Sequence, residues 1–387
     1  MSRRHVVVLT TGRQDYGILR STLLLLHESP QVELSLVAGG MHLRHEFGRT
    51  IDCIREDGLP IARTIDFVSD PPDAPADAAR ALAAMGTALR ELRPDMLVIV
   101  GDRSETLAAA HAAALRAVPV VHLHGGEETE GAVDNLFRHA ITKLSHLHLV
   151  SSELHAQRVR QMGEPTESIV VVGAPGLDNR FRSDLPSLDT LRTRLGNPLA
   201  EPIVVVTVHP TTLGVQESPV AEVSAVAAAM EQVRATYVVT QPNSDTGGRA
   251  IREFWRSWAR GREGVVLIDA LGEASYWSLL LHARAMLGNS SSGIIEAPAV
   301  GVPVIDVGDR QRGRERSALV RGVAASTPEI ASALTHALAR VAEPGHASTV
   351  EPSETSAAAR VLAALLHWEP PRPPRKSFAS SPVVCDP

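Results

Sequence analysis

Short segments rich in valine and isoleucine alternate along this chain with longer alanine-rich or amphipathic segments. This alternation is typical of parallel sheets covered by helices, because a crossover between parallel strands is usually a helix. One series of strand-like segments runs from His5–Thr10 to Ile169–Val172, and a second runs from Ile203–Thr207 to Pro303–Val307. The sequence therefore predicts an α/β protein with two Rossmann-like domains.

The 387 residues are too many for one compact core and suit two domains. The polar stretch that begins with GAPGLDN marks the boundary, so we predict domains over residues 1–178 and 179–368 with a cleft between them. The proline-rich residues 369–387 contain few apolar side chains, and we predict that they are disordered. Ligands of such sheets bind outside the carboxyl ends of the strands, so residues directly after strands are the candidates for a site.

Charge and cysteine content argue against several classes of protein. The formal net charge is −6, and no basic stripe with interleaved aromatics indicates a nucleic-acid binder. The two cysteines, Cys53 and Cys385, do not make a disulfide framework, which fits a reducing compartment. No apolar stretch is long enough to span a bilayer. We therefore predict a cytoplasmic protein without a membrane or nucleic-acid partner.

Charged residues follow two strands of the first half. Gly12 and Arg13 come after the first strand, where a glycine turn and a guanidinium at a helix start form either an anion site or a solvated loop. After another strand, Asp102 and Arg103 offer a base and an anion clamp, or Asp102 simply caps the next helix. Both interpretations stay open on these residues alone.

The densest group of polar residues is the segment HLHGGEETEGAVD, which starts at His122. Carboxylates such as Glu127 and Asp134 lie beside imidazoles, a combination that supplies acid and base partners. His122 and His124 share one strand face, so zinc has to be weighed. The sequence has no HExxH motif and no cysteine partner for them, and we predict no metal.

The second half carries two further candidate segments. His209 follows the strand Ile203–Thr207 and is either a core histidine or a residue of the cleft. The segment GNSSSGIIEAP places serines at a helix start, which suits a diphosphate, and Glu296 one turn later, where it can accept from ribose hydroxyls. The segment DRQRGR, which contains Arg310, adds cations after the next strand.

Taken in order, these segments resemble the hydrolysing UDP-N-acetylglucosamine 2-epimerases of sialic-acid and related nonulosonate pathways. The resemblance runs from about Val6 to Arg314 and rests on the motifs GDRSE, HLHGGEETEGAVD, RHAITKLSHLHLVSS, QMGE, VVGAPGLD, VTVHP, GNSSSGIIEAP and GDRQRGR. It implies a glycosyltransferase-B-like pair of domains, a UDP-sugar substrate, a homodimer and no cofactor. Its family reaction breaks the bond from carbon-1 to UDP, removes the carbon-2 proton to give a glycal, and adds water to release the free 2-epimer.

The resemblance also implies roles for individual residues. The catalytic candidates are Asp102, Glu127, Asp134, His124 and His209; some relatives have a catalytic glutamate at the position of His124, which leaves the acid and base roles open between His124 and Glu127. The substrate-binding candidates are Arg13, Arg103, His209, Asn243, Ser290, Ser291, Ser292, Gly293, Glu296 and Arg310. A UDP-sugar glycosyltransferase and a non-hydrolysing 2-epimerase are the alternative functions, and the sugar is either N-acetylglucosamine or a 2,4-diacetamido sugar.

Overall fold

A computed structural model describes residues 3–71, 73–130, 133–211, 220–242, 247–269, 271–339 and 356–379. Contacts divide the chain into unit 1, with Met1–Glu127, Asp134–Asp178 and Pro352–Pro387, and unit 2, with Glu128–Val133 and Asn179–Glu351. The division after Asp178 lies where the sequence places its boundary. Two segments differ from the predicted domains: Glu128–Val133 belongs to unit 2, and the chain after residue 351 returns to unit 1.

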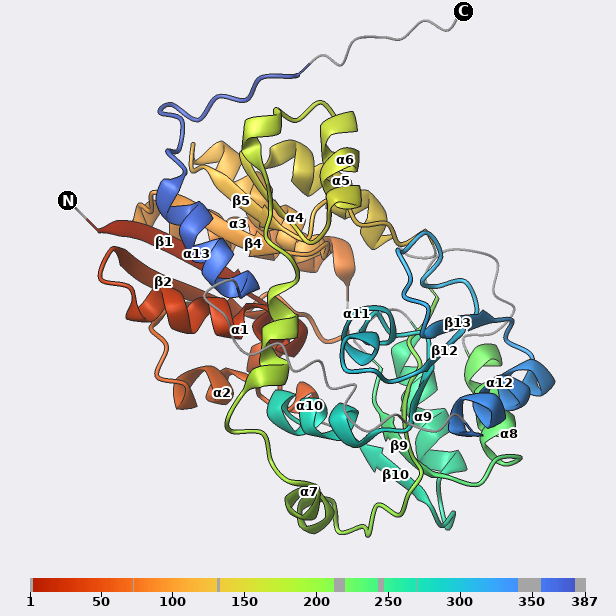
Figure 1. The fold of residues 1–387 in the computed structure, drawn as a ribbon. Coiled ribbons are helices and arrows are strands. Elements are labelled where there is room, and N and C mark those ends of the chain that lie inside the picture. The colour runs from red at the N-terminus through yellow and green to blue at the C-terminus, as the bar shows by residue number, and fades with distance from the viewer. Residues whose placement is uncertain are drawn as a thin grey trace, which may run out of the picture. The chain divides into compact units, whose positions relative to one another are not determined.

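Unit 1 is built on a seven-stranded parallel sheet with the order β3-β2-β1-β4-β5-β6-β7 (Figure 1). The strand order reverses between β1 and β4, as in doubly wound folds, and this is where such sheets bind ligands. The strands are β1 Arg4–Thr10, β2 Val32–Gly39, β3 Ile61–Ile65, β4 Met96–Val100, β5 Val120–Leu123, β6 Leu147–Val150 and β7 Ile169–Val171.

Helices cover both faces of this sheet. Alternate residues of β1 enter two separate cores: Val6 and Val8 pack with α1 and α13, whereas Val7 and Leu9 pack with α3 and α4. A strand buried on both faces must be apolar throughout, which explains its run of valines. The helices are α1 Arg13–Glu28, α2 Ile51–Glu56, α3 Ala74–Leu92, α4 Ser104–Leu115, α5 Asp134–Leu144, α6 Glu153–Gln161 and α13 Ala357–His367, with short 3-10 turns at Gly40–Leu43, His45–Phe47 and Thr166–Ser168 and a longer one, Pro175–Phe181, across the division.

Unit 2 repeats the architecture with a six-stranded parallel sheet of order β10-β9-β8-β11-β12-β13. The order reverses between β8 and β11. The strands are β8 Ile203–Thr207, β9 Thr236–Thr240, β10 Val265–Ile268, β11 Ala285–Gly288, β12 Val304–Val307 and β13 Val320–Val323, and the helices are α7 Leu188–Leu195, α8 Ala221–Met230, α9 Gly248–Trp258, α10 Glu273–His282, α11 Ser292–Ala299 and α12 Thr327–Ala339. The prediction of two Rossmann-like α/β domains is thus confirmed.

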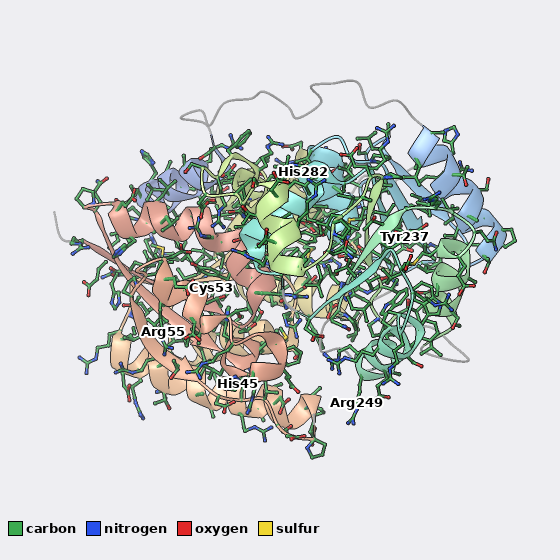
Figure 2. All side chains as sticks on the ribbon, turned by 90° about the horizontal axis from the view of Figure 1, so that it is seen from below. His45, Cys53, Arg55, Tyr237, Arg249 and His282 are labelled. Carbon is green, nitrogen blue, oxygen red and sulfur yellow. The ribbon has the colours of Figure 1, made fainter. Side chains whose placement is uncertain are left out.

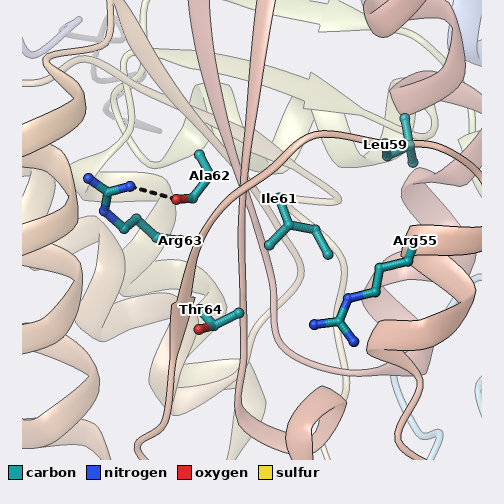
Figure 3. Close-up of a pocket in the computed structure, with 6 residues that line it drawn as sticks. All are labelled: Arg55, Leu59, Ile61, Ala62, Arg63 and Thr64. Carbon is teal, nitrogen blue, oxygen red and sulfur yellow. Dashed lines mark hydrogen bonds between the residues drawn. The ribbon is translucent and has the colours of Figure 1, made fainter.

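The strands β3 and β13, each at one edge of its sheet, were not predicted from the sequence. Residues of both strands are largely half-buried or exposed, and each contains arginine, so neither has the apolar run by which the central strands are recognised. Edge strands pair on one side only and need less apolar surface. A hollow of about 480 Å³ lies against β3 and is lined by Arg55, Leu59 and Ile61–Thr64 (Figure 3). It contains none of the predicted site residues.

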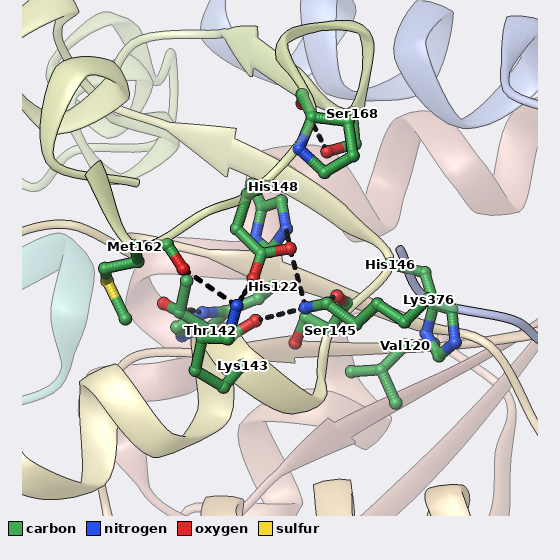
Figure 4. A network of polar contacts seen from close by, with 12 residues as sticks. Val120, His122, Thr142, Lys143, Ser145, His146, His148, Met162, Ser168 and Lys376 are labelled. Atoms are coloured by element: carbon green, nitrogen blue, oxygen red, sulfur yellow. Dashed lines mark hydrogen bonds and ion pairs between the residues drawn. The ribbon is translucent and has the colours of Figure 1, made fainter. Parts of the chain in front are cut away.

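The end of the chain lies against unit 1. α13 contributes Val361 and Leu365 to the core beneath β1, and the residues that follow it, predicted to be disordered, make defined contacts up to Ala379. The Lys376 ammonium donates to the carbonyl oxygens of Thr142 (2.9 Å) and Ser145, at the end of α5, and pairs with Glu164 at 2.7 Å (Figure 4). Residues 380–387 lie outside the described residues.

Side chains fill both units (Figure 2). Cys53, labelled there on α2, is exposed and is a free thiol. Among the described residues, no helix combines the length and the hydropathy that crossing a membrane requires.

Candidate active site

The candidate site of unit 1 begins at its switch point, where β1 and β4 lie side by side. Arg13 is the first residue of α1 and is exposed, with Gly12 as the N-cap in an extended conformation. Two residues later the buried Asp15 carboxylate accepts from the backbone N–H (2.9 Å) and the hydroxyl (2.6 Å) of Thr11. The turn that carries Arg13 is therefore fixed from inside the protein.

A second buried carboxylate faces the same hydroxyl. Glu105 accepts from Thr11 Oγ1 at 3.2 Å and from Arg103 Nε at 2.6 Å. Burial raises the pKa of Asp15 to about 6, although Arg103 and Thr11 oppose the shift. Burial would also raise the pKa of Glu105, but the Arg103 guanidinium outweighs it and lowers that pKa. Arg103 therefore binds an internal acid and links the turns after β1 and β4.

Asp102 lies directly beyond β4 and pairs with Arg138 of α5. The Asp102 side chain is 25% exposed, whereas that of Arg138 is 1% exposed. The same guanidinium donates to the backbone oxygen of Glu127 at 2.8 Å and to Asn135 Oδ1 at 3.0 Å. Arg138 thus connects the turn after β4 with the turn after β5. Removing a partner of such a buried cation destabilises the fold by about 3–5 kcal/mol.

The turn after β5 holds an imidazole against a carboxylate. His124 Nδ1 lies 2.6 Å from Glu127 Oε1, and both side chains are less than 10% exposed. Glu127 Oε1 also accepts from Ser151 Oγ at 3.1 Å, and Ser151 Oγ lies 2.8 Å from His155 Nδ1. Gly126 makes the tight turn possible: its φ is +76°, and a Cβ there would lie 2.4 Å from the His155 carbonyl oxygen.

His122 and His124 have different surroundings although they share one segment. His122 is fully buried, and its Nε2 lies 2.7 Å from the carbonyl oxygen of Gly101, so this nitrogen carries the proton and donates it. Burial lowers the pKa of His122 to about 3. His122 therefore braces the glycine that precedes Asp102.

Asp134 is the first residue of α5 and is half-buried, and its negative charge helps to raise the pKa of Arg138. The residues just before it in the sequence belong to unit 2: the Glu130 N–H donates to the Arg312 carbonyl oxygen at 2.9 Å, and their side chains form an ion pair at 3.0 Å. Unit 1 therefore places Asp102, Glu127 and Asp134 around Arg138, and His124 lies against Glu127.

In unit 2, a single buried side chain joins the loops at the switch point between β8 and β11. The Asn289 amide accepts from the His209 N–H at 2.7 Å and donates to the His209 carbonyl oxygen at 2.9 Å. Its nitrogen also lies 3.0 Å from Glu222 Oε2. Asn289 is fully buried, so it fixes the half-buried His209 at the end of its strand.

The serine turn after β11 adopts the predicted strand, turn and helix geometry. Gly288 has φ +133°, and a Cβ there would lie 1.9 Å from the Thr207 carbonyl oxygen, so only glycine allows the two strands to approach. Ser291 is the N-cap of α11, while Ser290 Oγ accepts from the Ser292 N–H at 3.3 Å. Serine hydroxyls and helix N–H groups at this terminus form a site suited to phosphate oxygens.

Arg310 is buried and lies beneath this turn. Its guanidinium donates to the carbonyl oxygens of Pro210 and Asn289, both at 3.2 Å, and Gln311 donates to the same Asn289 oxygen at 2.9 Å. Arg310 therefore braces the turns that carry His209 and Ser290 and brings positive charge to them. Glu296 lies one turn into α11 and is half-buried.

Contacts join Asp102, Glu127 and His124 in unit 1, and His209 and Arg310 through Asn289 in unit 2. Arg13 and Glu296 lie on α1 and α11 of these units, and Asn243 lies outside the described residues. The sequence analysis gave no role to several residues that hold these groups together: Asp15, Glu105, Arg138, Ser151, Glu222 and Asn289. The one available signal for Arg138 was its position four residues into the helix after an acidic loop. Nothing in the sequence indicates that Ser151 contacts Glu127.

The chain matches the UDP-N-acetylglucosamine 2-epimerase family over residues 25–366. It belongs to this family. The match covers most of both units and includes every candidate site residue described above except those in the turn after β1 and at the start of α1.

Several named proteins are similar to this chain. A UDP-N,N'-diacetylbacillosamine 2-epimerase (hydrolyzing) of Legionella pneumophila is 38% identical over 87% of this chain and 89% of its own. A GDP/UDP-N,N'-diacetylbacillosamine 2-epimerase (hydrolyzing) of Campylobacter jejuni is 33% identical over 82% and 83%. Among solved structures, the UDP-GlcNAc 2-epimerase of Methanocaldococcus jannaschii matches with a TM-score of 0.78 at 14% identity, covering 94% of this chain and 100% of that one, which supports the fold.

Proposed function

We propose that the protein is a hydrolysing 2-epimerase that converts a UDP-linked N-acetylated sugar to UDP and the free 2-epimer. Loss of UDP from carbon-1 and of the proton from carbon-2 forms a glycal, and water then adds with inversion at carbon-2. Unit 2 would hold the diphosphate at the Ser290–Ser292 turn, and unit 1 would supply the acid and base groups. The names of the relatives favour a 2,4-diacetamido-6-deoxy sugar as the substrate.

The observation that carries this proposal is that Asp102, Glu127 and Asp134 surround Arg138, with His124 against Glu127. A transferase that only binds and moves a sugar needs the diphosphate site, but proton removal and return at carbon-2 need at least two acid or base groups. The preorganised turn in unit 2 would stabilise the charge that develops on the leaving diphosphate.

Incubation in heavy water tests the proposal. We expect UDP and a free 2-epimer that carries deuterium at carbon-2, with the faster turnover on the UDP-2,4-diacetamido-6-deoxy sugar and the slower on UDP-N-acetylglucosamine. Intact UDP-sugar labelled at carbon-2 would instead identify a non-hydrolysing epimerase. Sugar released without deuterium would refute 2-epimerisation. The homodimer that the resemblance implies is tested separately by light scattering of the purified protein.

A further inference from the structure

The His124 imidazole and the Glu127 carboxylate form a hydrogen-bonded dyad directly after β5. His124 lies directly after β5 with φ +64°, a left-handed conformation that is uncommon for residues other than glycine. Its N–H donates to the Leu149 carbonyl oxygen at 3.1 Å, which holds the residue in this conformation. Strained backbone of this kind persists where the surrounding structure over-determines it, often at functional sites.

Hydrogen bonding sets the tautomer of the His124 ring. An ionised carboxylate only accepts, so the proton of a neutral His124 ring lies on Nδ1, which faces Glu127 Oε1 at 2.6 Å. The lone pair is then on Nε2. That atom is buried and has no hydrogen-bond partner within the part of the chain that the structure describes. Buried polar atoms normally have partners, so an orphaned imidazole nitrogen points to a ligand that supplies one.

The contacts of Glu127 indicate that its carboxylate orients the His124 ring. Glu127 Oε1 is already engaged by His124 and Ser151, and the backbone oxygen of the same residue is held by Arg138. Asp102 in turn is paired with Arg138. The other charged or titratable groups around the dyad are Arg138 from α5, Asp102 after β4 and two residues of α6. His155 of α6 reaches it through Ser151, and Arg158 of α6 donates to the Gly126 carbonyl oxygen at 3.2 Å.

We propose that His124, through Nε2, takes the proton from carbon-2 of the sugar, and that Glu127 is a positioning residue. This inference rests on the proposed function. As the carbon-2 proton moves to Nε2, the C–H electrons form the double bond between carbon-1 and carbon-2, and the electrons of the bond from carbon-1 to oxygen leave with UDP. The imidazolium that results is stabilised by the Glu127 carboxylate. Glu127 itself exchanges no proton with the sugar.

Three variants test the assignment. His124→Asn keeps a residue that tolerates a left-handed backbone and an amide N–H that can face Glu127, and we expect kcat to fall about 100-fold or more because the base is gone. Glu127→Gln removes the negative charge that stabilises the imidazolium, so a similar fall in kcat is expected. UDP affinity, measured by calorimetry, should change less than about threefold in both, since an acid–base group acts on the barrier. His111→Gln, an exposed histidine on α4, is the matched control.

The pH dependence separates a catalytic role from a structural one. The wild type should show kcat/KM rising with pH as Nε2 becomes available, and this ascending limb should be absent from the residual activity of His124→Asn. If His124→Asn keeps kcat within about threefold of the wild type and retains that limb, while Glu127→Gln loses activity, the assignment is overturned and Glu127 is the base. If the wild type itself releases no UDP and exchanges no deuterium, the proposed function fails, and this inference with it.

Discussion

Lys376 tests whether the end of the chain is an integral part of unit 1. The side chain of Glu164 is 1% exposed and is paired with Lys376 at 2.7 Å and Lys143 at 2.6 Å, with His148 Nε2 at 3.0 Å. Lys143 is 41% exposed, so Lys376, at 23%, is the better shielded cation. Burial alone would raise the pKa of Glu164, but hydrogen bonds from His148, Lys143 and Lys376 lower it to about 2.

Replacing Lys376 with methionine keeps most of the apolar stem and removes the charge. Losing one partner of a buried ion pair costs about 3–5 kcal/mol, and because Lys143 and His148 remain on Glu164, we expect a loss of about 2 kcal/mol. For a unit of this size that corresponds to a fall in Tm of about 4–8 °C. The measurement is the free energy of unfolding in urea, with thermal melts beside it.

Arg375→Met is the control, because it removes the same charge from the adjacent residue and leaves the ion pair between Lys376 and Glu164 in place. In a double-mutant cycle with Glu164→Gln, the cost of Lys376→Met should shrink by about 1 kcal/mol or more, since residues in one ion-pair network couple. A Lys376→Met protein within about 0.5 kcal/mol of the wild type, and equal to Arg375→Met, is what a solvated tail would give, and would refute the reasoning.

Three further outcomes follow from the described contacts. Asp102→Asn should lower kcat at least about 100-fold with UDP affinity retained; weakened UDP binding alone would contradict a catalytic role. Glu296→Ala should raise KM with a smaller effect on kcat, and an unchanged KM would remove Glu296 from the ribose site. Because the folded-state pKa of Glu164 is about 2 and its ordinary value is 4.5, its stabilisation is complete above pH 4.5 and is lost as the pH falls toward 2; Glu164→Gln should flatten acid unfolding curves in that window, and an unchanged curve would count against the network.

The sequence alone was sufficient for the architecture and for naming candidate residues after the strands. Strands buried on both faces, such as β1 and β4, must be continuously apolar, and parallel pairing requires intervening helices. The two series of strands could therefore be predicted from the sequence. Ligand-binding turns follow such strands, so position made Asp102, His124, His209 and Ser290 candidates. Their roles came from the family resemblance and stay predictions. The edge strands β3 and β13 lack that apolar signal and were missed, whereas the opposite edges, β7 and β10, carry it and were predicted.

Only the tertiary structure decided how these residues are supported. Arg138, Ser151 and Asn289 act through contacts with residues distant in sequence, and no local pattern encodes a hydrogen bond between separate loops. The same holds for Lys376. Its proline-rich surroundings predicted disorder because their apolar content is low, but an ion pair with Glu164 and the carbonyl oxygens of Thr142 and Ser145 hold it on unit 1. Periodicity reports which face of an element is buried; long-range polar contacts depend on which elements the fold brings together.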